Sequence, residues 1–259
     1  MVGRLRKGPP DVLPVGLVLF AQILVDEEPG HWHHARAMKA FLTLVAAATA
    51  AVVGAIGATS TASVASVGIA PLTKKQAHEI QRSGEWHPGC PVSPGQLRLV
   101  TARYNGFDHE THLGQIVVNR DVAASVLRVF GKLYAMRFPI REMSFAAMYG
   151  PHPHPNGDVT ASFECRQAAA SPCSGGRTGT WSMHAYGEAI DLDPRENPYV
   201  GCGMTRDKTA ISYMNRKNVR PGMVTRAIYR RTFARVGWGW GGLWSGSTKD
   251  YMHFSSNGH

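Results

Sequence analysis

The chain has 259 residues, 44% of them hydrophobic and 18% charged, which is enough for one substantial core and too few for several large domains. Aromatic residues argue against a disordered chain, and 28 glycines with 16 prolines indicate a loop-rich globular fold. A net charge of +10 favours an anionic partner surface.

The first 62 residues have the composition of a leader. Residues 40–73 contain no charged side chain and follow a basic start at Met38. A basic start, an apolar middle and a small-residue end predict a secretory signal peptide over residues 38–62. The alternative is a membrane anchor formed by residues 40–58, because the apolar run is about long enough to span a bilayer. Residues 1–37 then lie upstream of a natural translation start, as an extension or a further leader, and their HWHH cluster is assigned no metal.

Four cysteines, all beyond the leader, fit an exported protein. An even count in an oxidising compartment indicates two disulfides, and spacing alone leaves three pairings open. A cysteine zinc site is disfavoured because the sequence has no C-x2-C pair. The cysteines are Cys90, Cys165, Cys173 and Cys202.

In chain order, the residue pattern first predicts a short polar helix at 73–83 and strands at 97–104 and 114–119. Apolar residues at helical spacing predict a helix at 122–137, with Asp121 as its N-cap. The later predicted elements are a strand at 140–145, a surface excursion at 149–180, a strand at 189–193, a helix at 221–236 and a short strand at 251–255. Two histidines of the excursion, His152 and His154, are interpreted as solvated loop residues because no third ligand lies nearby in the sequence.

Two motifs carry the residues suited to chemistry. In S-M-H-A-Y-G-E-A-I-D, His184 and Asp191 lie seven residues apart, and Gly187 allows a turn between them. Near the C-terminus, D-Y-M-H-F adds His253 and Asp250. Two imidazoles and one carboxylate leave a fourth tetrahedral position for water, which is typical of a catalytic zinc site.

We therefore predict one zinc ion, held by His184, Asp191 and His253. A carboxylate that does not ligate the metal can take a proton from water and pass it to a leaving amine, and Asp250 fits that role. Residues three apart point to opposite faces of an ideal strand, so this role requires irregular backbone at 249–250.

Neighbouring residues are given supporting roles. Ser182 is interpreted as a hydrogen-bonding support, because no G-x-S-x-G elbow surrounds it. Asp193 and Glu188 are interpreted as surface groups or as neighbours of the ligands, but not as ligands. The tryptophans of GWGWGGLW are predicted to be core residues, with the alternative that one of them lines a substrate groove.

The first motif matches the SxHxxGxAxD signature of the M15 family, and the second resembles the closing motif of that family. The likeness to these D-alanyl-D-alanine carboxypeptidases and L-alanyl-D-glutamate endopeptidases extends over roughly Trp86 to Phe254, and includes HPGCPV, FPIREM, SFECR, ENPYV and GWGWGG. It implies a compact single α+β domain with a central antiparallel sheet flanked by helices, as in M15 DD-peptidases and hedgehog-like domains.

The resemblance also implies roles for single residues. It makes His184, Asp191 and His253 the zinc ligands and Asp250 the general base. It makes Arg166 the arginine that steadies the substrate carbonyl and the developing oxyanion, which is sound electrostatics beside a metal.

The resemblance further implies that Cys90 pairs with Cys165, which leaves Cys173 to pair with Cys202. The loop PHPHPNGDVTAS departs from the acidic, Asn-rich loop of close members, so substrate contacts are not carried over to it.

Export and resemblance together predict zinc-dependent hydrolysis of an amide bond in peptidoglycan stem peptides, as a D-Ala-D-Ala carboxypeptidase. The alternative within this class is an L-Ala-D-Glu endopeptidase. The alternative of another class is a non-catalytic, zinc-stabilised module that binds the cell wall, which the presence of Asp250 beside a complete ligand set disfavours.

The predicted organisation is a linker at 63–85 that leads into the fold, followed by a zinc peptidase domain at 86–259. The expected protein is a secreted monomer whose partners are its peptidoglycan substrate and an anionic cell-wall surface. Nucleic acid is disfavoured as a partner, because the basic residues at 200–235 are scattered singly and the protein is exported.

Overall fold

The protein is described by a computed structural model over residues 66–174 and 176–259. The chain divides into two units, 1–61 and 62–259, and every described element belongs to the second. The predicted signal peptide, the upstream extension and the alternative anchor lie outside the described residues. Within the described ranges, the helices are too short or too polar to cross a membrane.

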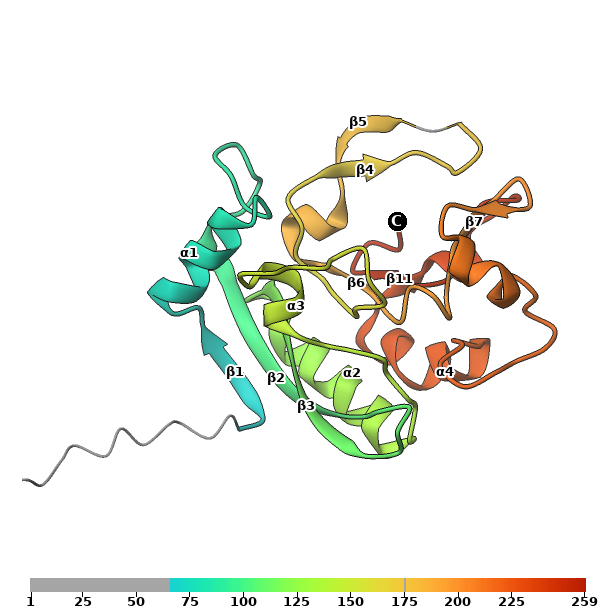
Figure 1. The fold of residues 1–259 in the computed structure, drawn as a ribbon, viewed down its shortest axis with the longest axis horizontal. Coiled ribbons are helices and arrows are strands. Elements are labelled where there is room, and N and C mark those ends of the chain that lie inside the picture. The colour runs from blue at the N-terminus through green and yellow to red at the C-terminus, as the bar shows by residue number, and fades with distance from the viewer. Residues whose placement is uncertain (1–65, 175) are drawn as a thin grey trace, which may run out of the picture. The chain divides into compact units, whose positions relative to one another are not determined.

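The fold is α+β, as predicted, and neighbouring strands in its sheets pair antiparallel (Figure 1). The helices are α1 Lys74–Arg82, α2 Ala123–Ala135, α3 Phe145–Tyr149 and α4 Arg226–Arg231. The strands are β1 Gly68–Pro71, β2 Leu97–Asn105, β3 Thr111–Asn119, β4 Gln167–Ala169, β5 Arg177–Trp181, β6 Ala189–Asp191, β7 Tyr199–Gly201, β8 Met204–Thr205, β9 Gly239–Trp240, β10 Lys249–Asp250 and β11 His253–Ser255.

The N-terminal half is built on the sheet β1-β2-β3. Side chains alternate along β2, so Val100 and Ala102 pack with α2, whereas Leu97 and Leu99 pack with α1 and α3. Figure 1 shows α2 lying along this sheet. Two cores therefore sandwich one sheet, and the core around α2 extends into the C-terminal half through the fully buried Phe254.

The C-terminal half consists of three small sheets rather than one central sheet. Their strand orders are β6-β11-β9, β10-β7-β8 and the hairpin β4-β5. The first of these sheets is anchored by the buried side chains of Ile190 and Leu192, which belong to the same core as α2. The strand predicted at 189–193 is confirmed over 189–191 as β6, and Leu192 and Asp193 lie beyond its end.

The N-terminus of α2 differs from its prediction. Asp121 is not the N-cap, because α2 begins at Ala123 after Val122 and no side chain caps it. The backbone N–H of Asp121 donates to Asn119 Oδ1 at 3.1 Å, and its carboxylate lies 3.5 Å from Arg120 Nε. A tight turn therefore occupies Asp121, and the helix starts after it. By contrast, the helix predicted at 73–83 is confirmed as α1, with a capping box.

The strand predicted at 140–145 is wrong. The N–H of Ile140 donates to the Asn105 carbonyl at 2.8 Å, and the Met143 carbonyl accepts from Gln115 at 2.9 Å, but these isolated bonds do not continue into a ladder. Ser144 then caps α3, because its side chain accepts from the N–H of Ala147 at 3.2 Å. Local capping therefore takes precedence over the β-like composition of the segment.

Two further predictions hold only in part. The segment 149–180 is not all surface, because Val159 and Phe163 are buried and the hairpin β4-β5 forms within it. The helix predicted at 221–236 is limited to α4, since the backbone of Thr232 leaves the helical region at φ −123° and ψ −95°. A 3-10 turn at Phe233–Val236 follows.

Candidate active site

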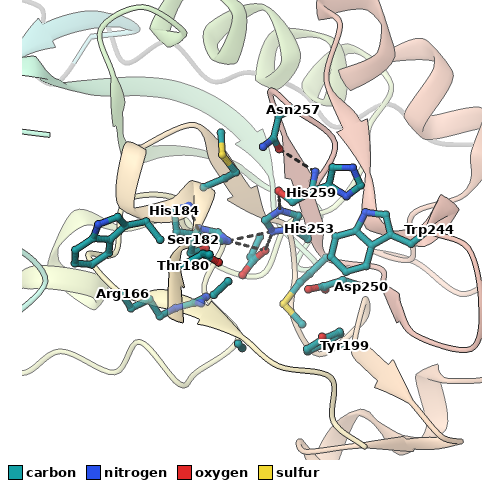
Figure 2. Close-up of a pocket in the computed structure, with 16 residues that line it drawn as sticks. Arg166, Thr180, Ser182, His184, Tyr199, Trp244, Asp250, His253, Asn257 and His259 are labelled. Atoms are coloured by element: carbon teal, nitrogen blue, oxygen red, sulfur yellow. Dashed lines mark hydrogen bonds and ion pairs between the residues drawn. The ribbon is translucent and has the colours of Figure 1, made fainter. Parts of the chain in front are cut away.

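The three predicted ligands come together at one end of the pairing between β6 and β11 (Figure 2). His253 lies directly opposite Asp191 in this antiparallel pair, and opposite residues present their side chains on the same face. His184 comes from the 3-10 turn Met183–Tyr186, which precedes β6. Gly187 ends that turn with φ +68°, and a Cβ atom there would lie 2.7 Å from the backbone nitrogen of Asn119. Both the backbone angle and the close approach require glycine.

The candidate ligand atoms form a nearly equilateral triangle. Nε2 of His184 lies 3.2 Å from Nδ1 of His253 and 3.3 Å from Oδ1 of Asp191, and the remaining side of the triangle is 3.2 Å. A point equidistant from three such atoms lies about 1.9 Å from each, close to the about 2.0–2.2 Å of Zn–N and Zn–O bonds. The spacing of these three atoms would therefore suit a zinc ion held by His184, Asp191 and His253.

The protons of the two histidines also fit a cation. Nδ1 of His184 lies 2.6 Å from the Ser162 carbonyl, and Nε2 of His253 lies 3.2 Å from the backbone oxygen of His259. When both rings are neutral, each donates its one N–H to that oxygen, which leaves His184 Nε2 and His253 Nδ1 as bare lone pairs. Two bare nitrogens and a carboxylate oxygen facing one another need a positive charge between them, and such outer hydrogen bonds are typical of metal-binding histidines.

The electrostatics of the metal-free triad lead to the same conclusion. Burial acts to lower the pKa of His184, but the Asp191 carboxylate outweighs it and raises that pKa above its ordinary value. Burial acts to raise the pKa of Asp191, but His184 and then His253 hold it well below the usual range. The cluster therefore keeps a carboxylate charged in a buried place, and a proton on a histidine is what compensates it when no metal does.

Asp250 lies beside the triad with one oxygen free for proton transfer. Its Oδ1 is buried and has no hydrogen-bond partner within the described part of the chain. Its pKa is raised to about 7, first by burial and then by Asp191, against the opposing effects of His253 and Arg166. The irregular backbone expected at 249–250 is found instead at 251–252, because β10 is a regular strand and the bend follows it. This bend lets Asp250 and His253 face one cleft.

Arg166 lies on the opposite side of the two histidines from Asp250 (Figure 2). Its Nε donates to Glu164 Oε2 at 2.6 Å, a short charge-assisted bond that fixes the guanidinium. This role of Glu164 was not predicted from the sequence. The motif SFECR does indicate it, because Glu164 and Arg166 are two residues apart and side chains at that spacing on an extended chain lie on the same face.

A cleft of about 370 Å³ contains this constellation. One wall is the hairpin β4-β5, with Trp181 exposed upon it, and the other wall includes Tyr199 and Trp244. Trp244 thus lines the groove, whereas Trp238 and Trp240 are buried in the core, so both alternatives predicted for the tryptophans occur.

Ser182 and Glu188 lie close to the ligand turn, whereas Asp193 is fully buried rather than at the surface. The Ser182 side chain accepts from the backbone N–H of His184 at 3.3 Å and so shapes the ligand turn. The Glu188 side chain accepts from Ser256 at 2.6 Å, and Asp193 is buried against the backbone N–H of Arg141, so neither carboxylate joins the triad.

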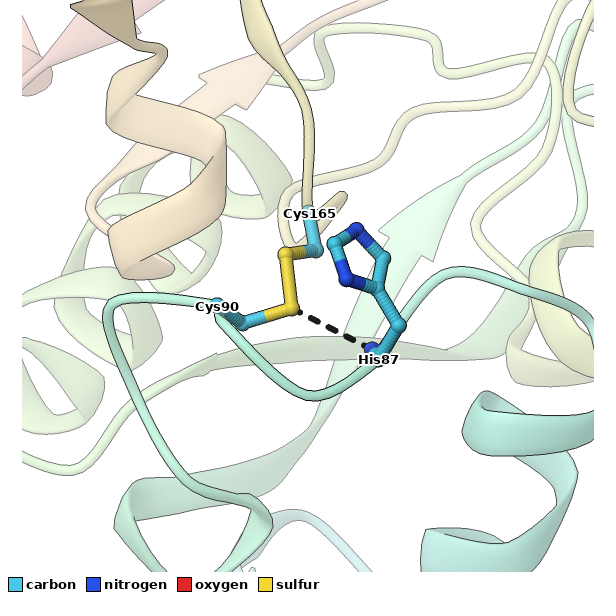
Figure 3. A group of neighbouring side chains, drawn as sticks. All are labelled: His87, Cys90 and Cys165. Carbon is cyan, nitrogen blue, oxygen red and sulfur yellow. Dashed lines mark hydrogen bonds between the residues drawn. A yellow bond between two sulfur atoms is a disulfide. The ribbon is translucent and has the colours of Figure 1, made fainter.

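The two disulfides follow the predicted pairing, Cys90–Cys165 and Cys173–Cys202, with Cα separations of 5.8 and 5.6 Å. A second cluster of metal-ligating residues consists of His87 with the first of these disulfides (Figure 3). Its sulfurs are bonded to each other and cannot act as thiolates, so it is a structural cross-link.

The loop histidines remain apart from any such cluster within the described residues. His154 lies 3.1 Å from Glu142 Oε2, and both His152 and His154 are exposed, so the interpretation as surface residues is consistent with the structure.

A compact α+β unit that gathers two histidines and two carboxylates in one cleft has residues suited to a metal-dependent hydrolase. Residues 175–256 match the family model described as D-alanyl-D-alanine carboxypeptidase, so this segment of the chain is similar to M15 peptidases. The matched segment holds all three candidate ligands and Asp250, whereas Arg166 precedes it. No match was found among curated proteins or among solved structures.

Proposed function

We propose that this protein hydrolyses an amide bond of peptidoglycan stem peptides with one zinc ion, as a D-Ala-D-Ala carboxypeptidase. The observation that carries the proposal is the triangle of His184, Asp191 and His253, with the unpartnered carboxylate oxygen of Asp250 beside it. The match of residues 175–256 to the family model supports peptidase chemistry, and the donor set of two imidazoles and one carboxylate favours zinc over calcium or magnesium.

When bound, zinc supplies a Lewis acid that polarises the scissile carbonyl and lowers the pKa of water. Asp250 then takes the proton of the attacking water at its free Oδ1 and delivers it to the departing amine. A carboxylate with a pKa of about 7 both accepts and donates a proton readily near neutral pH.

Arg166 donates to the oxygen on which negative charge develops. It is preorganised for this, because Glu164 holds its Nε, the Gln167 carbonyl accepts from its Nη1 at 3.4 Å, and the residue lines the cleft. A donor that is fixed before the reaction stabilises the transition state without reorganising, and such a donor typically contributes about 10²–10³-fold in kcat.

We also propose that the protein acts outside the cytoplasm. Two disulfides are typical of oxidising compartments, and the leader-like composition of residues 38–62 supports export. A peptidase of this family in that compartment meets the stem peptides of the cell wall.

The test is digestion of purified muropeptides by the full chain, with and without a chelator, followed by mass analysis of the products. Release of D-Ala, lost with the chelator and restored by zinc, is the expected result. A new N-terminal D-Glu identifies the endopeptidase instead.

Two variants serve as a matched pair. Asp250→Asn keeps the size of the side chain and removes the base, so it should lose activity by at least about 10²-fold. Glu188→Gln changes a nearby carboxylate that faces Ser256 rather than the triad, and it should retain activity. Zinc-loaded protein that cleaves nothing, or an Asp250→Asn variant as active as Glu188→Gln, contradicts the proposal.

A further inference from the structure

A carboxypeptidase substrate presents a free carboxylate one residue beyond the scissile bond, and recognising it requires a cation. Among the described residues that line the cleft, Arg166 is the only arginine or lysine, and Glu164 already pairs with it. A cation dedicated to the terminal carboxylate would therefore come from the rim of the cleft.

The register of the sheet β10-β7-β8 points to that cation. Asp250 pairs with Tyr199, and the other side of β7 pairs Val200 with Thr205. Arg206 follows Thr205 directly, one residue beyond the last pair of this ladder, and its charge acts on Tyr199. Directly opposite residues of antiparallel strands present their side chains on the same face, so Asp250 and Tyr199 lie side by side, and we group Arg206 with them as the row Asp250-Tyr199-Arg206. The first two members of this row line the cleft.

The charges of Asp250 and Arg206 both act on Tyr199, which lies between them in this grouping. The pKa of Tyr199 is raised, first by burial and then by Asp250, while Arg206 opposes the rise. Neighbouring strands lie about 4.8 Å apart, so the backbone of Arg206 is about 10 Å from that of Asp250. A single residue spans about 3.5 Å, so a terminal carboxylate beside Asp250 stays within reach of a long arginine side chain.

The side chain of Arg206 crosses toward the facing wall. Its Nη2 donates to the carbonyl of Ala170 at 3.4 Å, and the preceding Ala169 lines the cleft. Arg206 is exposed and has no carboxylate partner within residues 66–174 and 176–259. The Cys173–Cys202 disulfide ties the hairpin loop to the turn between β7 and β8, so both sides of this rim are held together.

We propose that Arg206 binds the C-terminal carboxylate of the peptide substrate and thereby gives the protein its preference for the last peptide bond. The inference rests on the proposed function, because it assigns a substrate group to the same cleft. Arg206 touches substrate but not the reacting atoms, so it determines specificity and leaves the chemical step to Asp250 and Arg166.

The experiment uses the zinc-loaded full chain and two substrates, diacetyl-L-Lys-D-Ala-D-Ala as the free acid and as its C-terminal amide. Wild-type kcat/KM should be about 10- to 100-fold higher for the acid, the value of a hydrogen-bonded charge pair. Arg206→Gln should lose that factor on the acid, mainly through KM, and change by less than about threefold on the amide.

Two further variants keep the result interpretable. Arg206→Lys retains the charge without the planar fork, and should keep part of the preference for the acid. Lys208→Gln removes the same charge from an exposed neighbour two residues away, and should keep the preference intact. Amide hydrolysis by Arg206→Gln also shows that this variant is folded.

The outcomes separate the two proposals. Equal loss by Arg206→Gln on both substrates, or equal hydrolysis of acid and amide by the wild type, overturns the role of Arg206 and leaves the peptidase proposal standing. Failure of the zinc-loaded wild type on both substrates overturns the proposed carboxypeptidase function and the Arg206 inference with it.

Discussion

Removing the metal from the triad of His184, Asp191 and His253 should destabilise the folded protein by an amount that can be stated in advance. Zinc that binds only the folded state adds about 2.7 kcal/mol when its free concentration is 100 times its dissociation constant. For a domain of about 150–250 residues, each 1 kcal/mol shifts the midpoint of thermal unfolding by about 2–4 °C. The expected shift is therefore about 5–11 °C between chelator-treated and zinc-loaded protein.

The pH dependence of that shift follows from the His184–Asp191 pair. In the metal-free protein the pKa of His184 is raised above its ordinary value of 6.5, so the protonated pair contributes stability that is fully present below 6.5. This contribution is lost as the pH rises through the raised pKa of the folded state. Zinc requires the histidine without its proton, so its stabilising effect grows over the same range. Metal-free stability should fall with rising pH while the zinc-induced shift increases.

Thermal unfolding followed by fluorescence, from about pH 5.5 to about pH 8 with and without zinc, measures both slopes. Asp191→Asn should abolish the zinc-induced shift, whereas His154→Ala, which removes an exposed loop histidine, should leave it unchanged. A zinc-induced shift that survives in Asp191→Asn, or that shrinks as the pH rises, would refute this account of the triad.

Three other substitutions test how the cleft is built. Gly187→Ala, measured by urea denaturation, should cost about 2–4 kcal/mol, because it adds a side chain at φ +68° and a Cβ atom 2.7 Å from the nitrogen of Asn119; a cost under about 0.5 kcal/mol contradicts the close approach. Replacing Cys173 and Cys202 together by serine should cost about 3.6 kcal/mol from the separation of 29 residues, again by denaturation, and a neutral result excludes the cross-link. Asp121→Ala should change stability by less than about 0.5 kcal/mol, since the residue does not cap α2, whereas a loss near 1 kcal/mol restores it as a cap.

The triad could be predicted from the sequence because its geometry is largely local. The turn that brings His184 toward Asp191 spans few residues, and Gly187 marks it through the one backbone angle that other residues avoid. His253 is distant in sequence, but it lies in the short strand β11, whose antiparallel partner is β6. This pairing places His253 opposite Asp191, as the two motifs taken together had suggested. The structure places these residues together, while their roles as zinc ligands and base remain for the experiments above.

The predictions that failed depend on contacts that no local pattern records. The composition of 140–145 suits a strand, yet the available hydrogen bonds come singly from Asn105 and Gln115, so no ladder forms. Polar residues in 149–180 conceal the buried Phe163, which packs against the far face of the first sheet. Arg206 was likewise beyond local patterns, because its closeness to Tyr199 depends on the pairing of β7 with β8, which ends one residue before it.

The bend at 251–252 explains how the base and a ligand come to share one cleft although they belong to different sheets. β10 holds Asp250 by pairing with β7, and β11 holds His253 by pairing with β6. The chain changes sheets at the bend, whose two carbonyls are both bonded: that of Tyr251 accepts from Trp240 Nε1 at 2.9 Å, and that of Met252 accepts from the N–H of Leu192 at 3.0 Å. These two hydrogen bonds hold the backbone of the bend in one conformation. The position of Asp250 relative to the triad is therefore fixed by buried residues of the core. Buried Trp240 thus contributes to the position of the base through its indole N–H, although it does not line the cleft.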